Sequence, residues 1–312
     1  MNQRRPIILW RFTDGKPGHD KQTEGLSRAL QEIVPCEVIN LPVRPALESL
    51  LALAAGRPPA ATQRHETPDL ALGAGHATHL SLLATRRATG ARIVVCMKPG
   101  LPCQWFDLCL VPQHDRVNEN DHIVLTRGAL NTQAPGDNKR AGTGLILIGG
   151  ISRHFEWQED RVLQQVKTIL AANTSVDWKI TDSRRTPATT TSKLAELGSG
   201  QVAFVPYNES PSDWLDRELR NCETAWVSAD SVSMIYEAVT AGCKTGIIEP
   251  GHSKHGKIAR SVQDLIEDHM ATSYSEWEKK KELRLPRSPL NEAGRCARLI
   301  HERFLSVINT SA

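Results

Sequence analysis

The sequence predicts an α/β protein of two consecutive domains, each built on a mainly parallel sheet. Its 312 residues exceed the usual size of one domain, and a hydrophobic content of 40% suffices for two cores. Short β-branched apolar runs alternate with helical patterns, which is typical of βαβ units. The polar stretch 131–143 interrupts this alternation, which then starts again, so we interpret that stretch as an interdomain linker.

The first domain is predicted to span residues 1–135. Its candidate strands are the apolar runs at 7–12, 36–41, 69–73, 92–97, 108–111 and 123–125. Apolar residues recur at helical spacing from Leu26 to Ile33, which predicts a helix that starts near His19 or Asp20. A second helix is predicted to begin at Pro45 and to end at Gly56.

The second domain is predicted to span residues 144–285. Its candidate strands lie at 145–148, 176–181, 202–205, 223–228 and 245–249, and its helical stretches at 157–172, 211–220, 230–241 and 256–270. Residues 291–308 carry apolar side chains at amphipathic spacing, so we expect a terminal helix that packs back on the first domain.

Composition argues against several classes of protein. Lys and Arg number 38 against 35 for Asp and Glu, and a net charge of +3 is too small for a nucleic-acid binder that relies on phosphate contacts. No apolar run approaches the roughly 20 residues that span a bilayer. The seven scattered cysteines fit reduced thiols in a cytoplasm. The pairs His76/His79 and His252/His255 have no nearby third ligand, so no metal site is predicted.

The segment Ala229–Ala238 gives the strongest local signal in the second half. Asp230, Ser233 and Glu237 fall on one helical face, apart from the apolar face. Unpaired N–H groups and the hydroxyls of Ser231 and Ser233 at the helix start suit a diphosphate, and Glu237 further in suits ribose hydroxyls. The alternative is an ordinary cap, in which Asp230 or Ser231 caps the helix and Glu237 is solvated.

Two other segments would converge on the same place, because ligands of doubly wound sheets bind outside the carboxyl ends of the strands. Gly149, Gly150 and Ser152 follow the first strand of the second domain, where glycine backbone can approach a phosphate. Arg184 and Arg185 follow the next strand and carry forked donors for phosphate oxygens. The alternatives are a simple glycine turn and a solvated pair of arginines.

The Gly-rich turn Thr13–Gln22 stands out in the first half. It differs from the GxGxxG and GxxxxGK[ST] patterns, so neither a dinucleotide site nor an NTPase is supported. His19 is a candidate general base toward an acceptor hydroxyl, with Asp14 or Asp20 orienting it or taking that role itself. The alternative is that Asp20 caps the helix and His19 is a surface residue.

A second glycine turn in the first half, Gly73-Ala74-Gly75-His76, repeats the arrangement of strand, turn and helix. Its small residues let another chain or a ligand approach closely. We assign Gly75 and His76, together with Lys16, to the acceptor side, although His76 is more typical of a helix start than of a catalyst.

Several motifs together resemble the mitochondrial-fission "elongated mitochondria" family, whose members are regarded as glycosyltransferases of the GT-B fold. The resemblance spans residues 7 to about 250. The motifs are TDGKPGHDKQTEGL (13–26), GAGHATH (73–79), PQHD (112–115), TRGALN (126–131), IGGISRHFEW (148–157), SRRTP (183–187) and SADSVSMIYEA (228–238).

More distantly, the second half is similar to the N-acetylglucosaminyltransferases that make the lipid-linked peptidoglycan precursor. The matching positions are a glycine loop at Gly149, Gly150 and Ser152, a helix start at Ser231, Ser233 and Met234, and a ribose-binding acid at Glu237. His19 falls where those enzymes place a histidine, but the turn here contains Pro17 and lacks their GGxGGH pattern.

These resemblances imply two Rossmann-like domains that face a cleft and a metal-independent transfer of sugar. The donor would be a nucleotide-diphosphate sugar, used as a co-substrate without a further cofactor, and the acceptor a hydroxyl on a cell-envelope glycan or lipid-linked glycan. The helix dipole, Ser hydroxyls and Arg184 or Arg185 would stabilise the leaving diphosphate. Such acceptors imply a cytoplasmic protein in peripheral contact with the inner membrane face. A nucleotide-sugar epimerase and a non-enzymatic fission adaptor are the alternatives.

Overall fold

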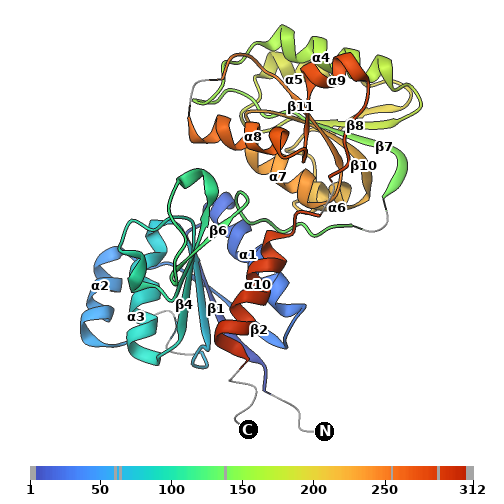
Figure 1. The fold of residues 1–312 in the computed structure, drawn as a ribbon. Helices are drawn as coiled ribbons and strands as arrows, with labels where there is room; N and C mark the ends of the chain where they lie inside the picture. The colour runs from blue at the N-terminus through green and yellow to red at the C-terminus, as the bar shows by residue number, and fades with distance from the viewer. Residues whose placement is uncertain are drawn as a thin grey trace. The chain divides into compact units, whose positions relative to one another are not determined.

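The computed structural model describes residues 5–59, 62, 65–136, 139–253, 256–286 and 289–306. It divides the chain into two compact units (Figure 1). The first unit combines Met1–Thr132 with Glu292–Ala312, and the second is Gln133–Asn291. The chain therefore returns to the first unit at its end.

The sheet of the first unit is parallel throughout, with the strand order β2-β1-β3-β4-β5-β6. Its strands are β1 (Ile7–Thr13), β2 (Cys36–Pro42), β3 (Leu70–Ala74), β4 (Arg92–Cys96), β5 (Leu108–Pro112) and β6 (Ile123–Thr126). All six predicted strands exist within one residue at each end. The β-branched and leucine-rich inner strands are buried on both faces, as a parallel sheet covered by helices requires, whereas the edge strand β2 is largely exposed or half-buried.

Helices cover both faces of this first sheet. α1 (Pro17–Gln31) and α10 (Glu292–Ile300) share one apolar cluster, whereas α2 (Ala46–Ala55) and α3 (His79–Thr89) lie over the other face. α2 ends at Gly56 as predicted, with the glycine in the left-handed conformation. α1 starts earlier than predicted, because Pro17 occupies its first turn. Short 3₁₀ segments lie at His76–Thr78, Cys103–Trp105 and Gln113–Asp115.

The predicted terminal helix is present as α10, which packs against α1 and continues as a π-helical segment, His301–Leu305. Cys296 and Ile300 are fully buried in the cluster shared with α1. Residues 307 and 308 of the prediction lie outside the described residues. The end of the chain thereby completes a face of the first sheet.

The sheet of the second unit is also parallel, with the order β12-β11-β10-β7-β8-β9. Its strands are β7 (Arg140–Leu147), β8 (Asp177–Thr181), β9 (Val202–Phe204), β10 (Cys222–Ser228), β11 (Lys244–Ile248) and β12 (Thr272–Ser273). The predicted linker 131–143 is wrong at its end, because β7 already starts at Arg140. Arg140, Thr143 and the small residues between them are partly solvated and carry no apolar signal.

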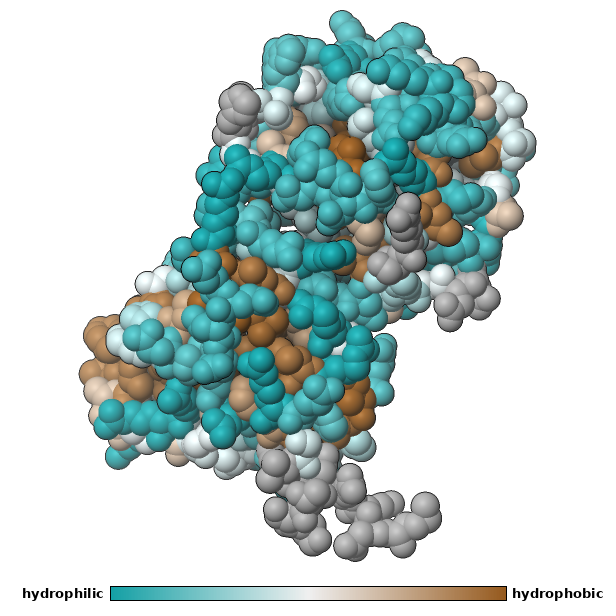
Figure 2. Space-filling model, viewed as in Figure 1, coloured by the Kyte–Doolittle hydropathy of each residue, from teal (hydrophilic) through white to brown (hydrophobic). Residues whose placement is uncertain are grey.

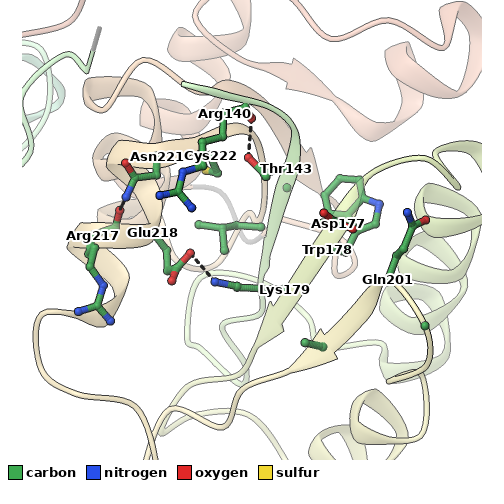
Figure 3. A pocket seen from close by; sticks show the side chains of 14 residues that line it. Arg140, Thr143, Asp177, Trp178, Lys179, Gln201, Arg217, Glu218, Asn221 and Cys222 are labelled. Atoms are coloured by element: carbon green, nitrogen blue, oxygen red, sulfur yellow. Dashed lines mark hydrogen bonds and ion pairs between the residues drawn. The ribbon is translucent and has the colours of Figure 1, made fainter. Parts of the chain in front are cut away.

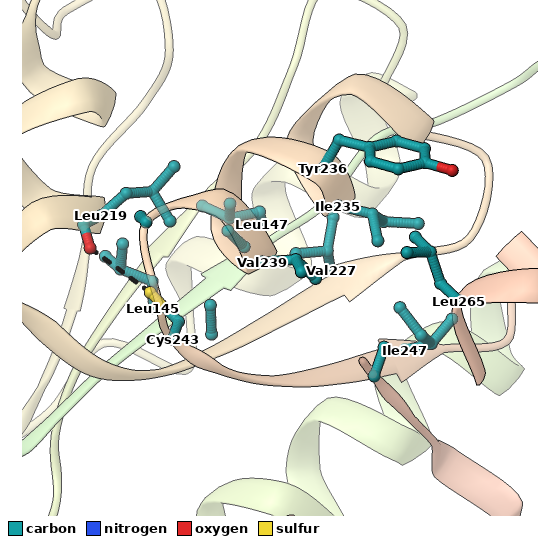
Figure 4. Packing of buried hydrophobic residues seen from close by; sticks show 14 of the residues in the cluster. Leu145, Leu147, Leu219, Val227, Ile235, Tyr236, Val239, Cys243, Ile247 and Leu265 are labelled. Carbon is teal, nitrogen blue, oxygen red and sulfur yellow. Dashed lines mark hydrogen bonds between the residues drawn. The ribbon is translucent and has the colours of Figure 1, made fainter. Parts of the chain in front are cut away.

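Helices cover both faces of the second sheet as well. α4 (Glu159–Ala172), α5 (Ala188–Ala195) and α9 (Tyr274–Lys280) pack on one face, and α6 (Trp214–Asn221), α7 (Val232–Thr240) and α8 (Lys257–Glu267) on the other. Figure 4 shows Ile235 and Val239 of α7 packed among Leu147 and Val227 of the strands. The sequence did not predict α5, whose run of threonines has low helix propensity.

Each sheet has one point where the strand order reverses. In the first unit this point lies between β1 and β3, and in the second between β7 and β10. Ligands of open parallel sheets bind outside the carboxyl ends of the strands at that point, because neighbouring turns diverge there to opposite faces. The turns after β1 and β3, and those after β7 and β10, are therefore where functional groups are expected.

Candidate functional site

A histidine–carboxylate pair occupies the reversal point of the first unit. His19 Nδ1 lies 2.9 Å from Asp14 Oδ2, and the Asp14 side chain is only 3% exposed. The other carboxylate oxygen accepts a hydrogen bond from the Lys16 amide at 3.2 Å. A carboxylate on Nδ1 orients the ring and favours the tautomer that leaves Nε2 as an acceptor. This arrangement suits a general base.

Gly75 brings the turn after β3 against this pair. Its φ is +75°, and a Cβ at this position would lie 2.3 Å from Cε1 of His19. The imidazole ring thus rests on backbone that only glycine provides. Lys16 Nζ is 3.6 Å from Asp14 Oδ2, whereas His76 is exposed at the start of a 3₁₀ segment. The structure therefore joins His19, Asp14, Lys16 and Gly75.

Asp14, and not Asp20, orients His19. Burial disfavours a charge on Asp14, but hydrogen bonds from His19 and the Lys16 amide, with the nearby positive charges, outweigh it and lower its pKa. Burial raises the pKa of Asp20, which lies inside the first turn of α1. The alternative in which Asp20 caps α1 is wrong, because Lys16 is the N-cap residue and no side chain caps this helix.

At the reversal point of the second unit, the glycine turn after β7 closes on the turn after β10. The Gly149 amide donates to Ser228 Oγ at 2.7 Å, and the Gly150 amide donates to Asp230 Oδ2 at 2.9 Å. A Cβ on Gly149 would lie 2.2 Å from Asp230 Oδ2. We expected these glycines to present backbone to a phosphate. Instead they admit the Asp230 carboxylate, and their N–H groups are already bonded.

The loop after β8 joins the same cluster through Arg185. Its guanidinium lies 2.8 Å from Asp230 Oδ2 and donates to the Gly150 carbonyl at 3.3 Å. Ser183 Oγ donates to the Gly149 carbonyl at 2.6 Å. Burial raises the pKa of Asp230, opposed by the hydrogen bonds from Ser228, the Gly150 amide and Arg185. The structure thus brings together the three segments that the sequence predicted to converge.

The start of α7 has no side-chain cap. Ser231 is its N-cap residue and makes no side-chain hydrogen bond to the first turn, while Asp230 is bonded to Gly150 and Arg185. The predicted alternative of an ordinary Asp230 or Ser231 cap is therefore wrong. Ser233 is exposed on this first turn, and Met234 packs partly against the core. First-turn amides without a cap concentrate the positive end of the helix dipole.

The predicted polar face of α7 is wrong beyond its first turn. Glu237 is only 2% exposed, and every residue from Ile235 to Thr240 is buried. On the adjoining side of the helix, Tyr236 contacts Ser261 of α8 at 2.8 Å, so α7 is a packed helix and not a surface one. Glu237 is thus neither solvated nor presented to a ribose on the helix surface.

Two further basic side chains surround the glycine turn, and we did not single them out from the sequence. Arg153 is exposed, and its Nε lies 3.1 Å from His154 Nε2. Burial, followed by the charges of Arg153 and Arg185, lowers the pKa of His154. Arg184 is exposed. Ser152 Oγ accepts hydrogen bonds from the backbone amides of His154 and Phe155 and so shapes this turn. The available signal was the Ser-Arg-His sequence at 152–154, one residue after the glycines.

Of the two histidine pairs, His76/His79 lies wholly within the described residues. Within the part of the chain that the structure describes, no three His, Cys, Asp or Glu side chains are grouped so that they could hold a metal ion. His79 is buried against the ring of Phe106, and burial lowers its pKa to about 4. His255 lies outside the described residues.

A cavity of about 460 Å³ lies at the other end of the second sheet (Figure 3). The amino-terminal halves of β7 and β8 and one side of α6 line it, and the ion pair between Lys179 and Glu218, at 2.8 Å, spans its floor. Ligands of such sheets bind at the carboxyl ends, so this cavity is separate from the cluster around Gly149.

Two Rossmann-like domains with these strand orders define the GT-B fold. The fold is shared with a Listeria monocytogenes protein assigned as a UDP-N-acetylglucosamine 2-epimerase, at 11% identity and a TM-score of 0.60, over 97% of this chain and 98% of that one. It is also shared with the Neisseria meningitidis UDP-GlcNAc 2-epimerase bound to UDP-GlcNAc, at 12% identity and a TM-score of 0.52, over 97% and 100% of the chains.

Within this fold class, the chain belongs to the Mitochondrial fission ELM1 family, which it matches over residues 17–304. It is 23% identical to the mitochondrial fission protein ELM1 of Arabidopsis thaliana over 287 residues, covering 78% of this chain. The match spans 65% of the length of the Arabidopsis protein.

Proposed function

We propose that this chain is a glycosyltransferase that moves a sugar from a nucleotide-diphosphate donor to a hydroxyl of a glycan or a lipid-linked acceptor. The second unit would bind the donor, and the first would activate the acceptor. The fold supports a sugar-nucleotide enzyme, since a structural neighbour holds UDP-GlcNAc. Family membership and fold alone do not define a reaction, so the proposal rests on the chemistry of the two reversal points.

One observation carries the donor assignment: the uncapped head of α7 lies next to a turn rich in arginine. No side chain caps the first turn, and Arg185 contacts the Asp230 carbonyl that directly precedes it. The exposed guanidinium of Arg184 adjoins Arg185 in the sequence, and that of Arg153 follows the glycine turn. Helix amides and guanidinium groups together stabilise a diphosphate without requiring a metal ion, and the sequence lacks a DxD motif.

The pair of His19 and Asp14 supplies the acceptor chemistry. His19 Nε2 would accept the proton of the acceptor hydroxyl as its oxygen attacks the anomeric carbon, while the bond from that carbon to the diphosphate breaks. Asp14 would stabilise the resulting imidazolium, as its 2.9 Å contact with Nδ1 allows. The nucleoside diphosphate leaves with its charge held by the helix head and the arginines.

A charge placed on the helix head tests the donor site. Ser233→Asp adds a carboxylate to the exposed first turn, where an acid favours the helix dipole, so the thermal midpoint should stay equal or rise. The same charge repels a diphosphate. We expect UDP- or GDP-sugars to stabilise the wild type in a thermal-shift panel that also includes ADP- and CMP-sugars, and Ser233→Asp to lose that shift.

Ser233→Asn is the matched control, since it has nearly the same size without the charge and should keep the nucleotide shift. Glu237→Gln separates the two roles of the buried acid. If the variant loses the nucleotide-induced shift but keeps its thermal midpoint without nucleotide, Glu237 contacts the ribose as predicted from the sequence. If the midpoint without nucleotide falls and the shift remains, the role of Glu237 is structural. If no nucleotide sugar shifts the thermal midpoint of the wild type, the proposed donor site is absent. The non-enzymatic fission adaptor is then the better hypothesis.

A nucleotide-sugar epimerase is the second candidate, because the structural neighbours at TM-scores of 0.60 and 0.52 carry that assignment or activity. An epimerase needs acidic groups on both sides of the sugar ring. Incubation with the donor alone distinguishes the two reactions. Interconversion of the sugar without any acceptor would favour the epimerase, whereas release of nucleoside diphosphate only when an acceptor hydroxyl is added would support the transferase.

A further inference from the structure

Helix α2 of the first unit exposes its apolar side. Leu47, Leu50 and Leu51 are 68%, 50% and 61% exposed. With the exposed Ala54 they form a stripe at i, i+3, i+4 and i+7, the spacing that normally faces a core. Ser49 is the buried residue of this helix, and its Oγ lies 3.3 Å from Ser81 Oγ of α3. The hydrophobic pattern of α2 is thus inverted.

Other helices of the chain show the ordinary pattern. α4 buries Val162, Val166 and Ile169 and presents its polar side outward. Helix α2 departs from this pattern, and Figure 2 shows its exposed apolar side chains as a brown patch at the left edge of the first unit, where Figure 1 places this helix. Apolar area of this kind on a surface marks an interaction site.

Basic side chains frame the stripe. Arg44 precedes α2 and Arg57 follows it, and both are exposed. Arg87 of α3 reaches the end of α2, since its Nε lies 3.6 Å from a Cβ built on Gly56. The one acidic residue of α2, Glu48, is paired with Arg44 at 3.0 Å. The surroundings of the leucines are therefore net positive.

A shallow groove runs beside the stripe. It has a volume of about 330 Å³ and is lined by apolar residues of α2, by the two prolines that follow, by both flanking arginines, and by Ser49 and Glu48, whose carboxylate is paired with Arg44. An apolar groove with a guanidinium from each flank suits a ligand that has a hydrocarbon part next to an anionic part.

We propose that the exposed face of α2 docks this protein on the surface of an anionic lipid bilayer. Leucines enter the boundary between headgroups and acyl chains, and Arg44, Arg57 and Arg87 bind lipid phosphates, as in helices that lie in a membrane plane. None of the helices among the described residues is long and apolar enough to cross a membrane, so the contact is peripheral. The proposal is independent of the proposed reaction.

The charge pattern favours a bilayer over a second copy of the chain. A twofold contact through α2 would bring the arginines of both copies together, and like charges repel across such an interface. An anionic surface instead neutralises the three arginines while it covers the leucines.

Vesicle co-sedimentation of the whole chain tests the proposal. We expect binding to phosphatidylcholine vesicles that contain about 30% phosphatidylglycerol, and weaker binding to phosphatidylcholine alone or in about 0.5 M salt. The double variant Leu47→Ser/Leu51→Ser should lower the partition coefficient at least tenfold. Both side chains are mostly exposed, so its thermal midpoint should not fall.

The control is Tyr207→Ser/Leu285→Ser, which removes two exposed apolar side chains of the second unit, 42% and 62% exposed, and should bind vesicles like the wild type. Arg44→Gln/Arg57→Gln tests the charge without touching the leucines, and should abolish the preference for anionic vesicles. Wild-type protein that stays in the supernatant, or leucine variants that still sediment, would overturn the proposal. A wild-type dimer that becomes monomeric in Leu47→Ser/Leu51→Ser would instead assign the stripe to self-association.

Discussion

The reversal points of the two sheets have the same topology and opposite chemistry. In the first unit, the buried carboxylate of Asp14 bonds a histidine whose side chain is 19% exposed. In the second unit, the buried carboxylate of Asp230 bonds a guanidinium and a backbone amide. A carboxylate thus fixes each site, but it orients a titratable base in one and a permanent cation in the other.

Under the proposed function, this difference would divide the work of a transfer reaction between the two units. A base must exchange a proton near neutral pH, which histidine does and arginine does not. A diphosphate needs charge that persists at every working pH, which arginine and helix amides supply. Variants at each carboxylate test whether the two have these separate roles.

The largest expected effect is on turnover. Removing the base with His19→Ala should lower kcat of the proposed transfer by roughly 10² to 10⁴-fold, the usual contribution of general base catalysis. The nucleotide-induced thermal shift should remain, because the proposed donor site lies in the second unit. Asp14→Asn should also lower kcat, whereas Asp20→Asn should leave it near wild type. Equal losses in the two aspartate variants would contradict the assignment of Asp14 as the orienting group.

A smaller effect is expected from Gly75→Ala. The added Cβ would lie 2.3 Å from the His19 ring, so the ring must shift, and kcat should fall by about ten- to a hundredfold, as misplaced catalytic groups do. Gly15→Ala is the matched control. Gly15 has φ +74° and nothing within 4 Å of a Cβ, so it shares the positive φ of Gly75 without the collision. If both variants lose activity equally, strain rather than contact with His19 is responsible.

The sequence predicted these two regions unequally well, for physical reasons. The strands follow from hydrophobic periodicity, which is a local signal. The convergence of the turns follows from the rule that ligands bind at the carboxyl ends of parallel strands, which depends only on topology. The partner of each polar side chain is set by packing. Periodicity places Asp230 and Glu237 on one polar face. It does not reveal that Asp230 bonds the Gly150 amide and Arg185, or that Glu237 is buried. Similarly, the glycine pattern predicts that Gly149 contacts a phosphate, but the carboxylate of Asp230 fills the space beside Gly149.

A moderate loss of stability is expected from Asp230→Ala. The variant removes the acceptor of the Gly150 amide and the partner of Arg185, so the free energy of unfolding should fall by about 1–3 kcal/mol. Asp213→Ala is the control, because its pair with Arg217 is 3.6 Å long and exposed on both sides, and such pairs contribute little. Urea denaturation measures both. An unchanged unfolding free energy in Asp230→Ala would show that the carboxylate does not hold the cluster together.

The smallest effect is a dependence of stability on pH with opposite signs for two neighbouring aspartates. The folded-state pKa of Asp14 is lowered, so its ionisation stabilises the fold above the unfolded pKa, and this is lost as pH falls through the folded pKa. The pKa of Asp20 is raised by burial, so its ionisation destabilises the fold, and acid relieves this.

Thermal midpoints measured from about pH 6 to about pH 3 resolve the two signs, since model aspartates titrate in that window. The thermal midpoint of the wild type minus that of Asp14→Asn should become less positive as the pH falls. The corresponding difference between the wild type and Asp20→Asn should become more positive. General acid unfolding affects all three proteins and cancels in these differences. A difference that does not change with pH for Asp14 would mean that its bond to His19 does not favour the charged carboxylate, and the base would then lack the partner that orients it.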